Sequence, residues 1–537
     1  MAGTIIENMS TKKLVFFGFF ILVFQVLFIM VGALIAPSPT SAIRYLATKC
    51  INRHRAHAWL VPWGSNRCQQ IHSFDEPLAK TLDANDIVFA VHIPLPNKEM
   101  SPWFQYMLAV LQFDIAFKII NQIEDDAIIT IDAGLAYRDD LISEWTTKFH
   151  SVEQRPLRCI FAVSKTYENE GRFYHCDPIP LMELESVAHK YFLINLRLPV
   201  NDTLNIGIGE IKDIHLVGIH QNGGFTRVWI SMKTMFCPWI FVATVWYWHR
   251  ISLMARHPVL LEKVIFALGI SVTFLNVPVE WLSLGFEWTW MLLFEDAQQG
   301  VFYYTLFCFW IIFCGEHLMD QSQRNQLSAY WWQVGLVMFS SSILLIFDLS
   351  ERGVHLTNPF YSVWASEIGM KVAITFVIVA GISFCLYFLS LCGMVHCVFR
   401  NIDGKINQFP EMPEARRLRY KGIVFRFKFF MLATLACAAM TVIFFILNQV
   451  SEGHWHWGDH TLQVHSAILT GTYGMWNLYV FTVIFLYAPS HNYNKRKSGD
   501  GQQTDVLEKA ESQETQLTCG EQGPTKTYRI TGKVTEE

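Results

Sequence analysis

Two kinds of hydrophobic pattern follow one another along the chain, and their order predicts its architecture. An unbroken apolar run covers Leu14 to Ala36, residues 37–232 are polar with a strand-like alternation, and further apolar runs follow. These later runs cover Thr234–Trp248, Val264–Leu284, Val301–Gly315, Trp331–Phe347, Val372–Phe399, Phe427–Asn448 and Val464–Ala488. Because about 20 apolar residues span a bilayer as a helix, we predict a multi-pass α-helical membrane protein with eight spans, the last seven forming a receptor-like bundle.

The polar stretch between the first two spans has the pattern of an all-β sandwich. Apolar and polar residues alternate in several segments, as expected for strands with one buried face. These segments are Ile87–Ile93, Ile129–Tyr137, Leu157–Val163 and Phe192–Leu198. Gln221 to Gly224 predicts a hairpin turn between the strands Leu216–Ile219 and Thr226–Ile230. The last strand would lead almost directly into the second span, so we expect the sandwich and the bundle to be rigidly connected.

The same patterns define the expected domains. They are an N-terminal segment (1–13), a first span (14–36), the β-domain (37–232), the bundle (233–488) and a polar tail (489–537). The first span could also be a cleaved signal peptide, but its run of roughly 23 apolar residues exceeds the core of about 7–15 residues in such peptides. We therefore favour a retained anchor. The tail is too polar to bury a core, which predicts disorder.

The distribution of charge predicts which side of the membrane each part faces. The connection that contains Arg250, Arg256 and Lys263 is basic, and so is the longer connection at residues 400–428. The alternate connections are acidic, for example at Glu287 and Glu452. Because cytosolic connections carry an excess of Lys and Arg, we expect both termini to be cytosolic and the sandwich to be lumenal.

Composition agrees with a membrane protein and argues against nucleic-acid binding. Apolar residues make up 52% of the 537 residues and charged residues only 16%, which is unusual for a soluble chain of this length. The formal net charge is −4, and the basic connections are explained by membrane topology.

Cysteines and one glycosylation triplet support a lumenal sandwich. Four of the twelve cysteines lie in the polar domain: Cys50, Cys68, Cys159 and Cys176. Pairing each with its neighbour in sequence would close two short loops, although four cysteines allow three connectivities. Disulfides form in an oxidising lumen. Asn201-Asp202-Thr203 is a glycosylation acceptor that is meaningful only on the same side.

Polar residues inside the spans are the candidates for ligand binding, because lipid offers them no hydrogen-bond partner. Asn276 and Glu280 are spaced to share a helix face, and Pro278 between them would free a backbone carbonyl. The last span has a second polar face with Tyr473, Trp476 and Asn477. Together these five residues are our candidate lipid-binding or cargo-binding site. The alternative is that they form hydrogen bonds between helices that stabilise the bundle.

The sequence gives no candidate for catalysis. It contains no GxGD aspartate motif, no GxSxG nucleophile elbow, no HExxH zinc helix and no glycine-rich phosphate loop. We therefore predict no catalytic residue, no metal and no cofactor. A different short motif lies in the basic connection: Tyr420-Lys421-Gly422-Ile423 fits the tyrosine signal that clathrin adaptors bind as an extended peptide.

Longer stretches of the chain resemble one known family. They are Asp86–Phe89, His92–Pro96, Met100–Phe104, Gly207–Asp213, Val259–Ile270 and Tyr473–Val480. With these, the chain resembles the Wntless family of transmembrane cargo receptors from the N-terminus to about residue 490. The resemblance implies a lumenal β-sandwich above a seven-helix bundle.

The resemblance also implies a function and its partners. Members of this family carry palmitoleoylated Wnt proteins from the endoplasmic reticulum and Golgi to the cell surface. Clathrin adaptors and retromer then return the receptor through endosomes, and Tyr420 to Ile423 matches the family's endocytic signal. The terminus, Thr531–Glu537, lacks the basic retrieval segment with which some vertebrate members end.

These observations lead to one main hypothesis and two rivals. We expect a non-enzymatic sorting receptor whose partners are lipidated Wnt proteins, the sorting machinery and membrane lipids. The first rival is a G-protein-coupled type of signalling receptor, but the chain lacks a DRY triad and an NPxxY motif. The second rival is an intramembrane acyltransferase.

Overall fold

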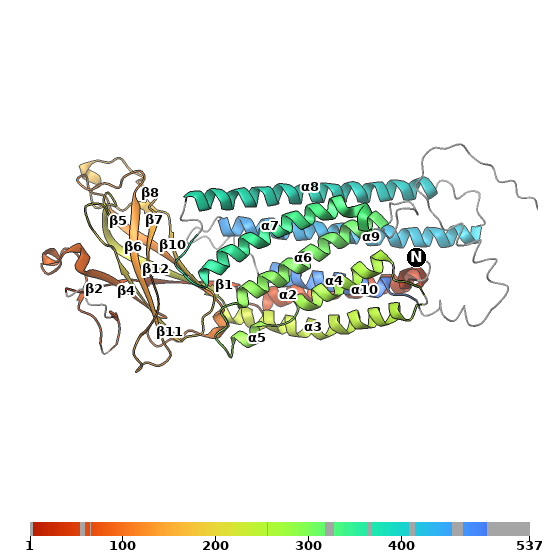
Figure 1. Ribbon diagram of the computed structural model, residues 1–537, viewed down its shortest axis with the longest axis horizontal. Helices are drawn as coiled ribbons and strands as arrows, with labels where there is room; N and C mark the ends of the chain where they lie inside the picture. Colours follow the sequence, from red (N-terminus) through yellow and green to blue (C-terminus); the bar gives the residue numbers. More distant parts are fainter. Residues whose placement is uncertain are drawn as a thin grey trace, which may run out of the picture.

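The computed structural model describes residues 4–53, 59–64, 66–254, 256–316, 327–362, 367–406, 414–453 and 466–490. A β-sandwich lies at one end of the molecule and a bundle of long helices extends from it (Figure 1). We call the end of the bundle that meets the sandwich the sandwich end, and the opposite end the distal end. Apart from Pro489 and Ser490, the predicted tail lies outside the described residues.

The prediction of eight spans is confirmed within the described residues. Eight helical segments are long and apolar enough to cross a membrane. They are α2 (Thr11–Leu34), α3 (Gly223–Ser252), α4 (Leu260–Leu275) with the short α5 (Glu280–Ser283), α6 (Met291–Glu316), α7 (Trp331–His355), α8 (Glu367–Ile406), α9 (Glu414–Gly453) and α10 (Ser466–Tyr487). A single-turn helix, α1 (Ile5–Asn8), precedes them.

The first span packs closely against the last one. Gly471 and Gly474 of α10 face α2, and a Cβ atom at Gly474 would lie 2.6 Å from the ring of Phe28. Gln25 donates a hydrogen bond to the Gly471 carbonyl at 2.9 Å, so a polar side chain in α2 finds its partner in the helix backbone. Small residues allow helices in lipid to approach in this way. The N-terminal anchor is therefore part of the bundle.

The sandwich consists of a four-stranded and a six-stranded antiparallel sheet, with a small third pair. The first sheet has the order β1 (Thr40–Leu46), β12 (Glu210–Gln221), β5 (Met107–Ala116), β10 (Ile179–Leu184). The second has the order β3 (Gln70–Ile71), β2 (Thr48–Ile51), β4 (Ile87–Ile93), β11 (Tyr191–Arg197), β6 (Ile128–Arg138), β7 (Thr146–Pro156). The short strands β8 (Cys159–Ile160) and β9 (His175–Cys176) pair with each other.

Aliphatic and aromatic side chains from both sheets fill the sandwich core. Leu111, Ile129, Leu135 and Phe192 are among its fully buried members. Of the three disulfide connectivities, the structure has the one with two short loops, Cys50–Cys68 and Cys159–Cys176. Each bridge limits the freedom of the unfolded chain and so stabilises the fold.

Two of the expected strands are wrong. The alternation at 157–163 gives only the two residues of β8, because the chain pairs there with β9 and not with the main sheets. Thr226–Ile230 lies inside α3, so the hairpin expected at 221–224 does not exist. Asn222 instead caps the helix: its side chain accepts a hydrogen bond from the Gly224 amide at 3.0 Å. Asn is a favoured residue at this position.

The expected rigid connection is present, and it has several parts. Only Asn222 separates β12 from α3. Lys148 of β7 forms an ion pair of 2.6 Å with Glu287, which lies between α5 and α6. The α7–α8 connection reaches furthest, because Phe360 is fully buried within the sandwich core. Each contact joins the sandwich to a different part of the bundle.

Candidate ligand-binding region of the bundle

Three of the five candidate residues form one buried hydrogen-bonded network between α4 and α10. The Asn276 amide group donates to the Asn477 Oδ1 at 2.6 Å, and the Tyr473 hydroxyl donates to the Asn276 Oδ1. Asn477 also donates to the Tyr473 carbonyl at 3.0 Å. Asn276 and Asn477 are completely buried and Tyr473 nearly so. These polar groups therefore satisfy one another inside the bundle.

Asn276 and Glu280 are close, but not because they share one continuous helix. Helix α4 ends at Leu275, Asn276 is its C-cap, and α5 begins at Glu280. Pro278 causes the break, since it has no N–H to continue the helix. The Phe274 carbonyl accepts hydrogen bonds from the Val277 amide at 3.2 Å and from the Gln298 side chain of α6 at 2.7 Å. The carbonyl that the sequence predicted to be free therefore has backbone and side-chain partners.

Glu280 has a cationic partner that sequence analysis missed. Lys233 of α3 forms ion pairs with Glu280 and, at 2.9 Å, with Glu295 of α6. Lys233 and Glu280 are only 1% and 2% exposed. Burial of an unpaired charge is costly, so these three charges stabilise one another. The signal in the sequence was a lysine next to an apolar run, but we placed it just outside the span.

Trp476 belongs neither to the hydrogen-bonded network nor to the ion pairs of Lys233. Its indole N–H donates to the Thr441 hydroxyl of α9 at 3.1 Å, and its ring packs against Phe302 and Tyr303 of α6. The five candidates therefore occupy three places: the Asn276–Tyr473–Asn477 network, the Lys233 ion pairs, and the contact between α9 and α10. All five are buried in contacts between helices.

A second charged cluster lies where the sandwich meets α6 and α7. Arg352 of α7 forms an ion pair with Asp296 of α6 and another, at 3.5 Å, with Glu183 of β10. Glu185 lies in the same region, and its carboxylate oxygens have no hydrogen-bond partner among the described residues. Burial raises the pKa of Glu185 to about 7, and the nearby Arg352 only partly offsets this effect. The sandwich therefore presents at this joint a carboxyl group whose pKa lies near neutral pH.

Helix α8 is packed unevenly along its length. Its buried side chains with appreciable volume are Tyr387, Leu391, Val395 and Val398, all in the half toward the distal end. In the half toward the sandwich, the buried residues whose side chains the structure describes are the small Ala373 and Ala380. Exposed apolar residues such as Ile368 and Val372 lie there too. Figure 1 shows α8 along the outside of the bundle.

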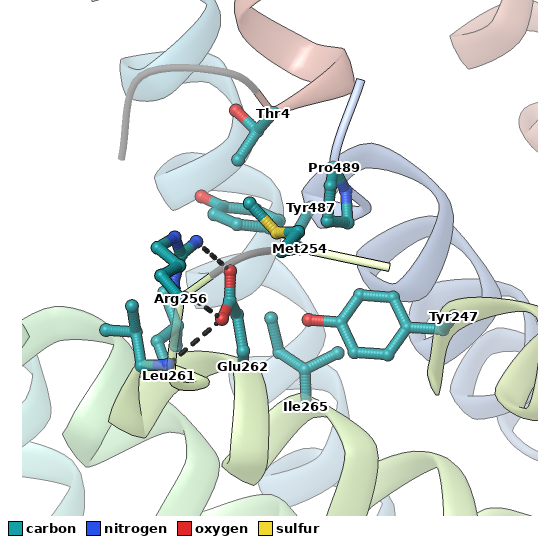
Figure 2. A pocket seen from close by; sticks show the side chains of 10 residues that line it. Thr4, Tyr247, Met254, Arg256, Leu261, Glu262, Ile265, Tyr487 and Pro489 are labelled. Atoms are coloured by element: carbon teal, nitrogen blue, oxygen red, sulfur yellow. Dashed lines mark hydrogen bonds and ion pairs between the residues drawn. The ribbon is translucent and has the colours of Figure 1, made fainter. Parts of the chain in front are cut away.

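A small pocket lies at the distal end, where α3, α4 and α10 meet the N-terminal segment (Figure 2). Arg256 and Glu262 form an ion pair of 2.5 Å at its edge. The Tyr247 hydroxyl is buried, points into the pocket, and has no hydrogen-bond partner among the described residues. A water molecule in the pocket could form a hydrogen bond with this hydroxyl. No motif in the sequence indicated the pocket.

The tyrosine motif lies in a helix. Tyr420 to Ile423 belong to α9, which begins at Glu414. Three residues further on, Arg426 donates hydrogen bonds to the carbonyls of Ile6 and Glu7 at 3.1 and 3.2 Å. Because adaptors bind such motifs as extended peptides, adaptor binding requires the first turns of α9 to unwind.

Asn201 of the glycosylation triplet lies on the surface of the sandwich, in the turn between β11 and β12. Its side chain is exposed and its Oδ1 accepts a hydrogen bond from the Asp202 amide at 2.6 Å. The site is therefore accessible to a modifying enzyme, which is a necessary condition for glycosylation.

Comparison with known proteins covers both halves of the molecule. Residues 48–221 match the family model "Wntless, GOLD domain", and residues 222–491 match "Wntless-like, transmembrane domain". The chain is 60% identical to "Protein wntless homolog" of Gallus gallus and 58% identical to that of Homo sapiens, each over the full length of both chains. It is 41% identical to "Protein wntless" of Drosophila grimshawi, over 91% of this chain and 90% of the relative.

Proposed function

Because this chain belongs to the Wntless family, we propose that it carries lipid-modified Wnt proteins from the endoplasmic reticulum and Golgi to the cell surface. Family membership supports a role in Wnt secretion. The finer proposal concerns how the cargo is held: the acyl chain enters the bundle while the sandwich binds the protein part. This is binding and transport, not catalysis.

The main support for the proposal is the set of contacts that join the sandwich to the bundle. The sandwich is fixed to the sandwich end of the bundle through Asn222, the Lys148–Glu287 ion pair and Phe360. Exposure of an acyl chain to water costs about 0.8 kcal/mol per CH₂, so a secreted lipoprotein needs a shielded route. A rigid sandwich above a membrane-embedded bundle provides two contacts for one lipidated cargo.

We propose that the acyl chain enters beside the half of α8 that is nearer the sandwich. Among the side chains that the structure describes in that half, the buried ones are the small Ala373 and Ala380, whereas the distal half is fixed by Tyr387 and Leu391. Loosely packed helices can separate at low cost, because few dispersion contacts are lost. The acyl chain would replace lipid along an already apolar surface.

The five candidates of the sequence, Asn276, Glu280, Tyr473, Trp476 and Asn477, remain proposed cargo-binding residues. Their contacts with one another and with Lys233 support an indirect role, in which they fix the positions of α4, α5 and α10 within the bundle that receives the acyl chain. Alanine at any of them would then lower cargo affinity without a direct contact to the lipid. Tyr473→Phe removes only the hydroxyl and is the mildest test.

We propose that the sandwich is lumenal and that both termini and the distal end are cytosolic. The basic connections support this sidedness. Two disulfides and the exposed Asn201 triplet agree with an oxidising, glycosylating compartment. Localisation to Golgi, endoplasmic reticulum, endosomes and plasma membrane follows from the proposed route.

For the return route, we propose that clathrin adaptors bind Tyr420 and Ile423 and that retromer retrieves the receptor from endosomes. Adaptor binding would require the start of α9 to unwind, and Gly422 supports this because glycine lowers helix stability by about 1 kcal/mol. Tyr420→Ala should therefore increase the amount of receptor at the cell surface.

The central test compares two cargoes on the full-length receptor in lipid nanodiscs. Acylated Wnt should bind at least about 100-fold more tightly than a Wnt variant that cannot be acylated, because the second lacks the apolar contact. A photoreactive acyl chain should crosslink near Ile368 and Val372 and not near Leu389, whose exposed fraction in the distal half of α8 lies between theirs.

Equal binding of both cargoes would overturn the proposal. Transfer of labelled acyl groups from acyl-CoA to Wnt by the purified receptor would show instead that the protein is an enzyme. Crosslinks restricted to Leu389 would retain lipid binding but reject the proposed entry beside the sandwich end of α8.

A further inference from the structure

One long strand at the edge of the sandwich lacks a partner on its outer side. The two sheets have four edge strands, and β7 (Thr146–Pro156) is the longest at 11 residues. It pairs with β6 on one side only. Among the described residues, no other backbone group forms a hydrogen bond with residues 146–156 on the outer side. Such an edge presents a row of free N–H and C=O groups.

The other three edge strands are shorter than β7, which ends at Pro156. Strand β3 has only two residues. Strand β10 contains Pro180, and its Glu183 amide already donates to the Pro359 carbonyl at 2.8 Å. Strand β1 has seven residues and ends one residue before the chain enters β2 of the other sheet. Short length, proline and covering segments are the usual means by which proteins block edge pairing.

Strand β7 contacts two of the connections between the helices of the bundle. Near one end, Lys148 pairs with Glu287 of the α5–α6 connection at 2.6 Å. Further along, Ser151 and Glu153 accept hydrogen bonds from Asn358 of the α7–α8 connection at 3.4 and 3.2 Å. The strand therefore lies against both connections, and the second of them leads into α8.

We propose that β7 is the docking edge for an extended strand of the cargo protein, which joins the six-stranded sheet through backbone hydrogen bonds. The inference rests on the proposed function and adds the mode of protein binding to it. Its occupant is the segment of cargo close to the acylated residue, because an acyl chain beside α8 places that segment next to Asn358.

This mode of binding has a consequence for specificity. Backbone hydrogen bonds do not depend on the side chains of the guest strand, so one edge can accept cargoes of different sequence. Selectivity then comes from the side chains on the exposed face of β7, such as His150, Val152 and Gln154. Val152 is 58% exposed and offers the guest an apolar contact.

Hydrogen exchange on the full-length receptor in nanodiscs tests this proposal directly. Acylated Wnt should slow exchange of the outward-facing amides between residues 147 and 154 at least tenfold, while amides of the edge strand β1 keep their rates. A photoreactive amino acid at Val152 should crosslink to cargo. The same group at Ile160, which is 72% exposed on β8, is the matched control.

The outcomes separate this inference from the function on which it rests. If cargo binds but the β7 amides exchange as before, the docking edge is wrong and the carrier function stands. Crosslinks at Val152 to a second receptor, in place of cargo, would likewise reject it in favour of self-association. If acylated cargo does not bind at all, both proposals fail.

Discussion

The sandwich and the bundle both have apolar cores, but they differ in their deeply buried polar groups and in what they expose. The sandwich core contains residues such as Leu111 and Phe192, and ion pairs such as Lys118–Glu210 lie toward its surface. The bundle buries Lys233 and Asn276 and exposes Phe16 and Trp332 to the surroundings, at 72% and 86%. The difference follows from the solvent: water accepts charges at the surface of the sandwich, whereas lipid accepts none.

This difference predicts where the molecule is sensitive to substitution. An exposed ion pair contributes about 0–1 kcal/mol, because water can solvate either partner alone. A buried pair in the bundle has no such alternative, so loss of one partner leaves an uncompensated charge. Polar substitutions should therefore matter most in the bundle and apolar ones most in the sandwich.

The largest expected effect is that of Lys233→Met. Without the cation, the buried Glu280 and the partly buried Glu295 lie beside each other uncompensated, and we expect the free energy of unfolding to fall by about 4 kcal/mol. Unfolding in mixed detergent micelles measures it. Adding Glu280→Gln and Glu295→Gln should restore most of the loss. Unchanged stability of the single variant would contradict the contrast between the two regions.

Phe360→Ala should cause the second largest loss of stability. The ring is fully buried in the sandwich core although it belongs to the α7–α8 connection. Its removal leaves a cavity and should cost about 3 kcal/mol. The thermal unfolding of the full-length protein measures the loss. Tyr361→Ala, at a residue 37% exposed, is the control and should have little effect. Similar stability of both variants would show that the sandwich does not depend on this connection.

Asn477→Ala tests the hydrogen-bonded network at a smaller scale. It removes the acceptor of the Asn276 amide and should lower the free energy of unfolding by about 2 kcal/mol, because a buried donor is left unpaired. The same micelle assay applies. Thr482→Ala, on the same helix but bonded to its own backbone, is the control. Equal losses at both positions would indicate general helix weakening.

The smallest effect expected is that of Glu185→Gln, and it depends on pH. Burial raises the pKa of Glu185 to about 7 from a usual value near 4.5, so the folded protein keeps a proton that the unfolded chain releases. The free energy of unfolding should therefore decrease as pH rises from about 4.5 to about 7. Glutamine removes this decrease and should stabilise the protein by about 1 kcal/mol at pH 8.

Melting temperatures at pH 5 and pH 8 measure this effect. The variant should melt higher than the wild type at pH 8 and close to it at pH 5. A variant that melts lower than the wild type at pH 8 would show that the ionised carboxylate of Glu185 is stabilised at the joint.

Much of the architecture could be predicted from the sequence, because long apolar runs and alternating strands have local signatures. Strands β4, β6 and β11 lie where the alternation placed them. Strand β7 was missed because polar residues such as His150 and Ser151 interrupt its pattern, as at an exposed edge. The start of α3 was missed because Gly223 and Gly224 also favour turns.

The contacts of the candidate site were less accessible to sequence analysis. Asn276 and Asn477 are 201 residues apart and meet only through the packing of α4 against α10. Lys233 was excluded from its span by one position, since a charge usually marks the end of an apolar run. In both cases the residue types were informative, but their partners are determined by tertiary structure.

Phe360 has a practical consequence for biochemists. Because Phe360 belongs to the α7–α8 connection but is buried in the sandwich core, a fragment that ends at residue 221 would lack one of the core residues of the sandwich. Such a fragment would have a hole in its interior and an uncovered β10 edge, where Glu183 normally meets Pro359. Weak binding of Wnt by that fragment would then reflect the missing core residue and not the affinity of the full-length protein.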